Sequence, residues 1–180
     1  DTIVLDKLSH ACLIDAAKLS GATLRVFPHN DLGRLGHLLK TTRMKAPDAR
    51  LLVVTESVFS MDGDVADLPG LAALAAAHDC VLMLDEAHAT GVLGSTGSGI
   101  AEYFVERGSL APDKHCVDVA MGTLSKALGS FGGFVACSVN MREFLINKAR
   151  SFIFATALPP SAAGAALESL HLLSEEPFRR

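Results

Sequence analysis

The stretch CVLMLDEAHATGVLG, residues 80–94, decides the fold class. It opens with a nearly continuous apolar run that ends at Asp85, a pattern typical of a parallel strand covered on both faces. Polar residues follow at once, and Gly91 and Gly94 permit a tight loop there. Ligands of open α/β sheets bind beyond the carboxyl ends of the strands. Asp85 and His88 are therefore the first candidates for a binding site.

Short apolar runs alternate with amphipathic segments on both sides of this stretch. The pattern predicts strands at 23–27, 51–55, 81–85, 117–121 and 133–137. It predicts helices at 8–19, 32–40, 68–78, 100–107, 141–149 and 161–173. Asp31 and Asn140 occupy predicted N-cap positions. Strands that alternate with helices predict an α/β fold with a mainly parallel sheet flanked by helices.

Length and composition predict one globular domain with a substantial core. The chain has 180 residues, of which 49% are hydrophobic and 20% charged, so it is too apolar for a disordered protein. The net charge is −4 and no run of Lys or Arg is present, which argues against nucleic acid or an anionic membrane surface as a partner. The longest uncharged stretch, 151–167, contains Pro159 and Pro160 and is too broken to span a membrane.

The chain start and the cysteines add three expectations. The start, DTIVLDKLSH, has no Met and no cationic apolar leader, which predicts a fragment of a longer cytoplasmic protein. The four cysteines form no Cys-x-x-Cys pair and are interpreted as single thiols in a reducing compartment. Asp62, Asp64 and Asp67 lack the spacing of a calcium loop and are interpreted as a solvated turn. No metal site is therefore expected.

Asp85 is suited to pair with a cationic nitrogen of a ligand. Opposite unit charges about 4 Å apart attract by about 4 kcal/mol at an effective dielectric of about 20. At about 1.4 kcal/mol per pKa unit, this raises the pKa of a pyridine nitrogen by up to roughly three units. The alternative is that Asp85 caps a turn or pairs with a nearby Lys. LDEAH also resembles the box of DEAH-type helicases, but GSTGSG at 94–99 lacks the lysine of their phosphate loop.

Lys126 lies in GTLSKALGSFGG, residues 122–133, between two predicted strands. We expect this loop to be buried, and burial lowers the pKa of an amine because it disfavours the charged form. A neutral amine can attack an aldehyde and form an imine. Thr123 and Ser125 place hydroxyls beside it, and the glycine-rich backbone offers N–H groups to a phosphate or phenolate. The alternative is a lysine whose amine reaches solvent.

Five segments together resemble one family, the α-oxoamine synthases. They are DKLSHACLIDA (6–16), VVTESVFSMDGDVADLPGL (53–71), LDEAHATGVLGSTGSGIAE (84–102), GTLSKALGSFGGFVA (122–136) and FIFATALPP (152–160). They run in the family's order and cover almost the whole chain. The resemblance implies a pyridoxal 5′-phosphate (PLP) enzyme of the aspartate aminotransferase fold, fold type I. Residues 1–180 would form its cofactor-binding large domain, without the N-terminal phosphate-contacting turn and the C-terminal small domain.

The resemblance assigns roles at the centre of this site. Lys126 matches the lysine that carries PLP as a Schiff base and moves protons at the substrate α-carbon. Asp85 matches the partner of the pyridine nitrogen, and His88 matches a hydrogen-bonding partner of the phenolic oxygen. His10, at the start of a predicted helix, matches the histidine that stacks on the ring. From the residues alone, His10 is more simply an exposed or locally satisfied side chain.

Further contacts are implied at the edge of the site. Ser60 and Thr123 match cofactor-contacting residues of the family. Thr156, in FATALPP, matches a residue that reaches the phosphate in a neighbouring subunit. The resemblance therefore implies a homodimer with shared active sites. The stretch 103–116 is longer than in compact members and has no explanation from the sequence.

The implied reaction is decarboxylative condensation of an amino acid with an acyl thioester, giving an α-amino ketone. HNDLGRLGHLL, AAKLSGA and ESVFSMDGD favour the members that use alanine and a pimeloyl thioester in biotin biosynthesis. Glycine-using acetyltransferases of the family are the alternative. An aminotransferase of the same fold also remains open. A non-catalytic partner subunit is disfavoured, because such subunits lack the lysine found here at Lys126.

Overall fold

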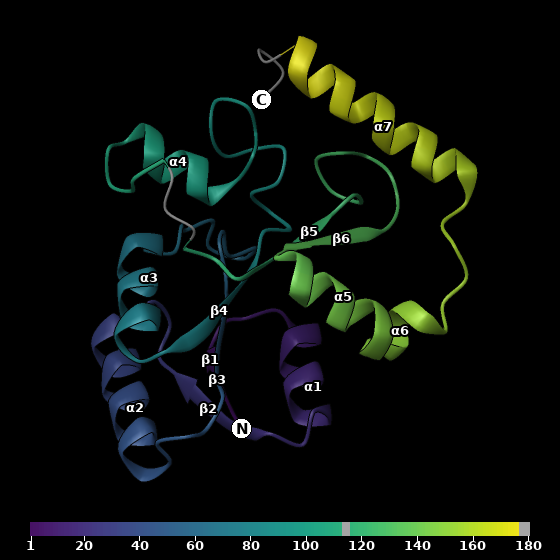
Figure 1. Ribbon diagram of the computed structural model, residues 1–180. Helices are drawn as coiled ribbons and strands as arrows, with labels where there is room; N and C mark the ends of the chain where they lie inside the picture. The colour runs from purple at the N-terminus through teal and green to yellow at the C-terminus, as the bar shows by residue number, and fades with distance from the viewer. Residues whose placement is uncertain (113–115, 177–180) are drawn as a thin grey trace.

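The computed structural model describes residues 1–112 and 116–176, which form one six-stranded sheet with helices packed against it (Figure 1). The strands are β1 (Thr2–Asp6), β2 (Thr23–Phe27), β3 (Leu51–Glu56), β4 (Cys80–Asp85), β5 (Val119–Thr123) and β6 (Gly133–Cys137). Their spatial order is β2-β1-β3-β4-β5-β6, and all neighbours are parallel except β5 and β6. The predicted α/β fold with a mainly parallel sheet is confirmed.

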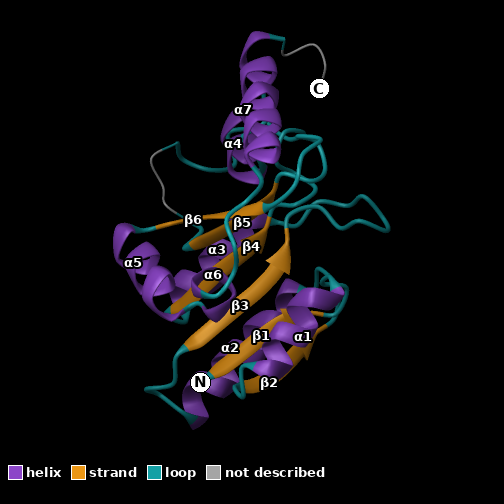
Figure 2. Ribbon diagram, turned by 90° about the vertical axis from the view of Figure 1, so that its right-hand side faces the viewer, coloured by secondary structure: helices purple, strands orange, loops and turns teal. Residues whose placement is uncertain are grey.

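Helices connect the strands and lie on both sides of the sheet, which Figure 2 shows as one continuous twisted layer. They are α1 (Ala11–Leu19), α2 (Leu32–Lys45), α3 (Leu68–Ala77), α4 (Ile100–Glu106), α5 (Val139–Lys148), α6 (Arg150–Ile153) and α7 (Pro160–Glu175). Helices α2, α3 and α4 lie on one side, while α1, α5 and α6 lie on the other (Figure 1). No helix among the described residues combines the length and the apolar character needed to cross a membrane.

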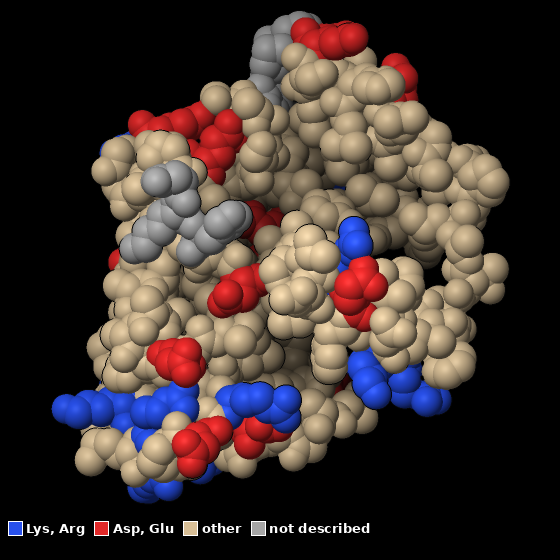
Figure 3. All heavy atoms as spheres, in the orientation of Figure 1, with Lys and Arg blue, Asp and Glu red and all other residues tan. Residues whose placement is uncertain are grey.

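The part of the chain from β6 onward is loosely packed. Four of the five residues of β6 are exposed, α5 and α6 contain no buried residue, and α7 buries Ala166 alone. Large apolar side chains stand in solvent there, among them Phe144, Phe152 and Phe154. Figure 3 shows a largely uncharged surface over the lower part of α7, with acidic side chains toward its upper end. We call residues 131–176 the open region.

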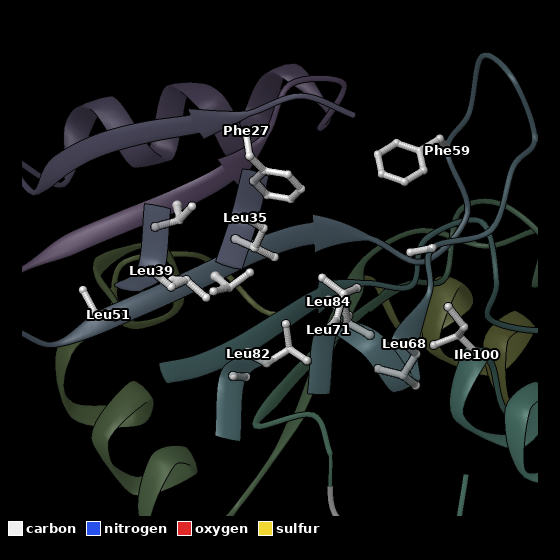
Figure 4. Close-up of a cluster of buried hydrophobic side chains, with 14 of the residues drawn as sticks. Phe27, Leu35, Leu39, Leu51, Phe59, Leu68, Leu71, Leu82, Leu84 and Ile100 are labelled. Carbon is white, nitrogen blue, oxygen red and sulfur yellow. The ribbon is translucent and has the colours of Figure 1, made fainter. Parts of the chain in front are cut away.

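The main core lies between the sheet and helices α2 to α4 (Figure 4). Alternate strand residues point into it, such as Leu82 and Leu84 of β4, because successive side chains of a strand face opposite sides. Residues between them, such as Leu5 and Val54, form a smaller cluster with Leu13 of α1. Burial on both faces explains why β3 and β4 are almost continuously apolar in sequence. We call β1–β4 with α1–α3 the packed region.

Five strands, β1 to β5, bring their carboxyl ends to the same edge of the sheet. β1, β3, β4 and β5 run parallel, so the loops that follow Asp6, Glu56, Asp85 and Thr123 emerge side by side. As the sequence predicted, His88 and Lys126 follow β4 and β5 in loops, whereas Asp85 and Thr123 are the last residues of these strands. The candidate site lies at this edge of the sheet.

Several sequence-based element assignments were wrong. Strand β1 was not predicted, and it lies inside the sheet between β2 and β3. The first helix begins at Ala11 rather than Leu8, because His10 has an extended ψ of 144° and serves as its N-cap. Asp31 caps α2 as predicted, but Ser138 rather than Asn140 caps α5 and accepts a hydrogen bond from the N–H of Met141.

Two further assignments differ in their limits. Strand β5 begins at Val119 rather than at residue 117, because the Asp118 carboxylate accepts a hydrogen bond from the N–H of Leu82 just before the strand. Helix α2 continues to Lys45, beyond the predicted end at residue 40. The long stretch 103–116 contains the end of α4, and its residues 113–115 lie outside the described residues.

Candidate active site

A pocket of about 200 Å³ opens at the shared edge of the sheet. It gathers side chains from the loops after β1, β4 and β5 and from the last residues of β3 and β4. Its lining consists of His10, Cys12, Glu56, Asp85, Ala87, His88, Met121, Gly122, Thr123, Lys126 and Gly133. Five of the seven residues that the sequence singled out are in this set, which brings together positions 10, 85, 88, 123 and 126.

Asp85 forms the buried acidic end of the pocket. It is the last residue of β4 and is 5% exposed. Its Oδ1 accepts a hydrogen bond of 2.9 Å from the N–H of Ala87, the one bond that its side chain makes among the described residues. The other carboxylate oxygen remains for a ligand. An isolated buried carboxylate is costly, so this arrangement favours a cationic partner.

Glu56 is a second buried carboxyl group that the sequence analysis missed. It pairs with Asp85 across β3 and β4 and is 4% exposed. Its Oε1 accepts a hydrogen bond of 2.5 Å from the N–H of His10, which fixes the start of α1 at the pocket. Burial, together with the negative charge of Asp85, raises the pKa of Glu56. The available signal was an acidic residue at the end of an apolar strand, VVTE.

The imidazole of His10 projects from the N-cap of α1 and is exposed beside the pocket. Its Nδ1 lies 3.3 Å from the N–H of Cys12, which donates to it, and 3.0 Å from Cys12 Sγ. These contacts and the bond to Glu56 restrain both the backbone and the ring. Burial and the nearby charge of Asp85 raise the pKa of the Cys12 thiol, so it stays protonated at neutral pH.

His88 and Lys126 approach the pocket from neighbouring loops. Burial lowers the pKa of His88, and the positive charge of Lys126 lowers it further, so His88 is neutral at pH 7. A neutral imidazole can both donate and accept a hydrogen bond. Lys126 lines the same pocket as Asp85, but its side chain is exposed. The expectation of a buried Lys126 was wrong, because its loop lies at the edge of the sheet where the carboxyl ends of the parallel strands emerge.

Thr123 closes the base of the loop that carries Lys126. Its Oγ1 donates to the carbonyl of Gly132 at 3.1 Å and accepts from the N–H of Ser125 at 3.2 Å. The Ser125 hydroxyl lies 2.7 Å from the same atom. The backbone bond from Leu124 N–H to the Gly132 carbonyl, 2.9 Å, completes the closure. Thr123 therefore shapes the loop as well as lining the pocket.

Two predicted site residues lie outside this pocket. Ser60 is exposed in the turn that follows β3, and Thr156 is exposed in the segment between α6 and α7. Neither is among the residues that line it. The described residues contain no group of three or more His, Cys, Asp or Glu side chains arranged to hold a metal ion.

The chain belongs to the aminotransferase class I and II family, whose model matches residues 1–180. Within this family it groups with the α-oxoamine synthases, which are PLP-dependent. It is 48% identical over 173 residues to an 8-amino-7-oxononanoate synthase of Geobacter sulfurreducens, covering 96% of this chain and 42% of that protein. It is 48% identical over 180 residues to the enzyme of that name from Cellvibrio japonicus, covering 100% of this chain and 43% of that protein.

Solved structures support the same relationship. A serine palmitoyltransferase from S. paucimobilis, solved with bound PLP and myriocin, superposes with a TM-score of 0.86 at 32% identity. The match covers 97% of this chain and 43% of that one. An 8-amino-7-oxononanoate synthase from Francisella tularensis gives a TM-score of 0.78 at 33% identity, over 100% of this chain and 49% of that one. The resemblance to the family and the fold type expected from the sequence are confirmed.

The residues of the pocket fit PLP by their chemistry. An amine at Lys126 suits an aldehyde, a buried carboxylate at Asp85 suits a protonated ring nitrogen, and a neutral His88 suits a phenolic oxygen. His10 offers a flat ring at the pocket rim. The chain spans less than half the length of the curated relatives it matches.

Proposed function

We propose that the full-length protein is a PLP-dependent α-oxoamine synthase that condenses alanine with a pimeloyl thioester, as in biotin biosynthesis. The observation that carries the proposal is the meeting of Lys126, Asp85, His88 and His10 in one pocket. Relatives of 48% identity bear the name 8-amino-7-oxononanoate synthase, which favours this member of the family. The activity belongs to a protein longer than the chain described here, since the relatives are more than twice its length.

Bound PLP supplies an electron sink for the reaction at the substrate α-carbon. Lys126 would hold the cofactor through its amine and would move the proton at the substrate α-carbon. Asp85 keeps the ring nitrogen protonated, and its burial strengthens this pairing because the surroundings are less polar than water. His88 binds the phenolic oxygen, and His10 restrains the face of the ring. Glu56 positions His10 through its backbone N–H.

The remaining parts of the proposal concern Thr123, which lines the pocket, and residues outside it. We propose that Ser60 contacts the cofactor from the turn after β3 and that Thr123 contacts it from the Lys126 loop. Thr156 is exposed, which suits a contact with the phosphate in a neighbouring subunit of a homodimer. The chain would be the cofactor-binding large domain of that protein, with a cytoplasmic location. The exposed apolar side chains of the open region suit a surface that a partner subunit covers.

Two rival substrates stay within the same family. The superposition on serine palmitoyltransferase, with a TM-score of 0.86, favours serine and a palmitoyl thioester as a second candidate pair. Glycine and an acetyl thioester are the other pair. An aminotransferase would transfer the amino group and form no carbon–carbon bond. Assays of alanine, glycine and serine against pimeloyl, acetyl, succinyl and palmitoyl thioesters distinguish these reactions, and activity confined to glycine or serine contradicts our choice.

The role of Lys126 is tested by the absorption spectrum of the full-length protein with PLP. The wild type is expected to show the band of a protein-bound PLP imine, and Lys126→Ala is expected to lose it. Lys40→Ala is the matched control, because Lys40 is an exposed lysine on α2 away from the pocket. A Lys126→Ala variant with the wild-type spectrum would refute the proposed function.

A further inference from the structure

His29 connects three parts of the molecule at the same edge of the sheet. Its Nδ1 lies 3.1 Å from Oδ1 of Asp6, at the end of β1, and its Nε2 lies 2.8 Å from Oδ2 of Asp64. Its ring meets the ring of Phe59 edge-on, with centroids 4.3 Å apart and an interplanar angle of 83°. No role for His29 is predicted from the sequence, although it is the first residue of the HNDLGRLGHLL segment after β2.

Phe59 and Asp64 are the two ends of the turn that carries Ser60. The N–H of Phe59 donates to the Asp64 carbonyl at 3.1 Å, and the N–H of Gly63 donates to the Phe59 carbonyl at 2.8 Å. An antiparallel bridge between Val58 and Val65 continues this pairing below the turn. Ser60 stands exposed between the two ends. A contact that fixes both ends therefore fixes the position of the Ser60 hydroxyl.

The other end of the contact is a fully buried carboxylate. Asp6 is 0% exposed, and it also accepts hydrogen bonds from the N–H groups of Leu8, at 2.8 Å, and Asn30, at 2.9 Å. Asn30 reaches the turn as well, since its Nδ2 donates to Asp64 Oδ2 at 2.6 Å. Asp6 is thus held rigidly by β1 and by the segment after β2. The turn is tied through His29 to a fully buried carboxylate at the end of β1.

Charge reinforces this geometry. Burial alone would lower the pKa of His29, but hydrogen bonds and charge interactions with Asp6 and Asp64 outweigh it and raise the pKa. A protonated imidazole donates from both nitrogens, which matches two carboxylate acceptors on opposite sides. Asp64 Oδ1 is buried without a hydrogen-bond partner among the described residues, and the other oxygen, Oδ2, lies 2.8 Å from His29 Nε2, where a protonated imidazole would compensate the carboxylate.

We propose that His29 is a positioning residue that fixes turn 59–64 against Asp6 and so holds the Ser60 hydroxyl toward the cofactor. This inference rests on the proposed function, because it gives Ser60 the cofactor contact that we proposed for it. His29 itself does not line the pocket and acts through the turn. Its effect is on cofactor affinity and not on the chemical step.

The test is a double-mutant cycle in the full-length protein. The affinity for PLP is measured from the absorption of the bound cofactor. His29→Gln and Ser60→Ala are each expected to weaken PLP binding by about tenfold, the equivalent of one net hydrogen bond. The double variant is expected to bind no more weakly than either single variant, because both changes remove the same contact. His37→Gln, an exposed histidine on α2, is the control and is expected to bind like the wild type.

The pH dependence of the PLP affinity provides a second test, because a merely structural role of His29 would not change it. The charged groups that face His29 are Asp6 and Asp64. The PLP affinity of the wild type should fall as pH rises through the raised pKa of His29, relative to the profile of His29→Gln. Asp64→Asn removes the charge and keeps an acceptor, and it should flatten the profile as His29→Gln does. Asp64→Asn also carries the test if His29→Gln does not fold.

Three results would overturn the inference. They are additive losses in the cycle, wild-type PLP affinity in a folded His29→Gln, and an unchanged pH profile in Asp64→Asn. These results are distinguishable from a failure of the proposed function itself. That failure appears as a PLP spectrum that Lys126→Ala leaves unchanged, whatever happens at His29. Loss of the band in Lys126→Ala with normal binding in His29→Gln overturns the positioning role alone.

Discussion

The packed region and the open region of this chain differ in how they use apolar residues. In the packed region, residues such as Val4, Leu35 and Leu82 are 0% exposed and share one continuous core. In the open region, α5 and α6 have no buried residue, and Phe152 is 65% exposed. Both regions have regular secondary structure. Regular secondary structure therefore forms in both regions, whereas a continuous core of buried side chains forms only in the packed region.

The candidate site lies where the two regions meet. His10, Glu56 and Asp85 come from the packed region, whereas Lys126 follows β5 and its loop contacts the open region. One such contact is the hydroxyl of Ser130, which donates to the carbonyl of Ala162 in α7 at 2.6 Å. The buried acidic end of the pocket is therefore rigidly held, and its amine lies on the more exposed side.

The largest effect should come from a core truncation in the packed region. Leu82→Ala removes a fully buried side chain from the middle of β4, and we expect a loss of about 4 kcal/mol in the free energy of unfolding. Leu170→Ala is the control in the open region, where the side chain is 50% exposed, with an expected loss below about 1 kcal/mol. Urea unfolding of both variants measures the contrast, and equal losses would contradict it.

The next effect concerns Glu86, which is 7% exposed at the end of the packed region. Burial raises its pKa to about 7, although the N–H of Ile100 and the Ser57 hydroxyl favour its ionised form. Because the folded pKa exceeds the unfolded value of 4.5, the folded state binds the proton more tightly. Stability should therefore decrease as pH rises from about 4.5 to about 7, by up to about 3 kcal/mol.

Glu86→Gln should remove this pH dependence, since a neutral amide has no proton to lose. Unfolding in urea across pH 4.5–7.5 measures the difference between wild type and variant. Glu143→Gln is the matched control, because Glu143 is exposed on α5 of the open region. A Glu86→Gln variant that keeps the wild-type slope would show that this carboxyl group is not protonated in the folded protein.

A smaller effect is expected from Asp6→Asn, which keeps the shape of a fully buried side chain and removes its charge. The N–H groups of Leu8 and Asn30 and the ring of His29 all bond to this carboxylate. We expect a loss of about 2 kcal/mol, since hydrogen bonds to a charged group contribute about 1.5–3 kcal/mol each and the amide retains part of them. Asp15→Asn, on the exposed side of α1, should change stability by less than about 0.5 kcal/mol.

The smallest effect should come from Phe152→Ser in the open region. In the chain of residues 1–180, we expect the free energy of unfolding to change by less than about 0.5 kcal/mol, because the ring is mostly in solvent. In the full-length protein, where we propose that a partner subunit covers this surface, the loss should exceed 1 kcal/mol. Thermal unfolding of both forms measures this. An equally small change in both would show that Phe152 stays uncovered.

The sequence predicted most of the fold because burial on both sides of a sheet leaves a clear apolar run, as in VVTE and CVLMLD. It failed at β1, where TIVLD carries the same apolar signal between the acidic residues Asp1 and Asp6. It also failed at Asn140, because Ser138 and Asn140 are both good N-caps and the choice depends on where β6 ends.

The site was predicted less completely, for reasons of tertiary structure. Asp85 and Lys126 share a pocket as the loop positions suggested, because parallel strands bring their carboxyl ends together. Glu56 was missed since nothing in local spacing shows that it pairs with Asp85 on the neighbouring strand. The exposure of Lys126 was missed because it depends on what covers the loop, which local sequence does not encode.

The position of β1 has a consequence for how the chain folds. Thr2 pairs with Thr23 on one side and with Leu51 on the other, so the first strand is completed only after the third has formed. The parallel pairs further along, such as Leu51 with Cys80 and Met83 with Val119, also close long loops. Each closure costs chain entropy before its contacts form, which makes such topologies slow to fold. The side of β1 that pairs with β3 therefore has no strand partner until residues 51–54 have been synthesised.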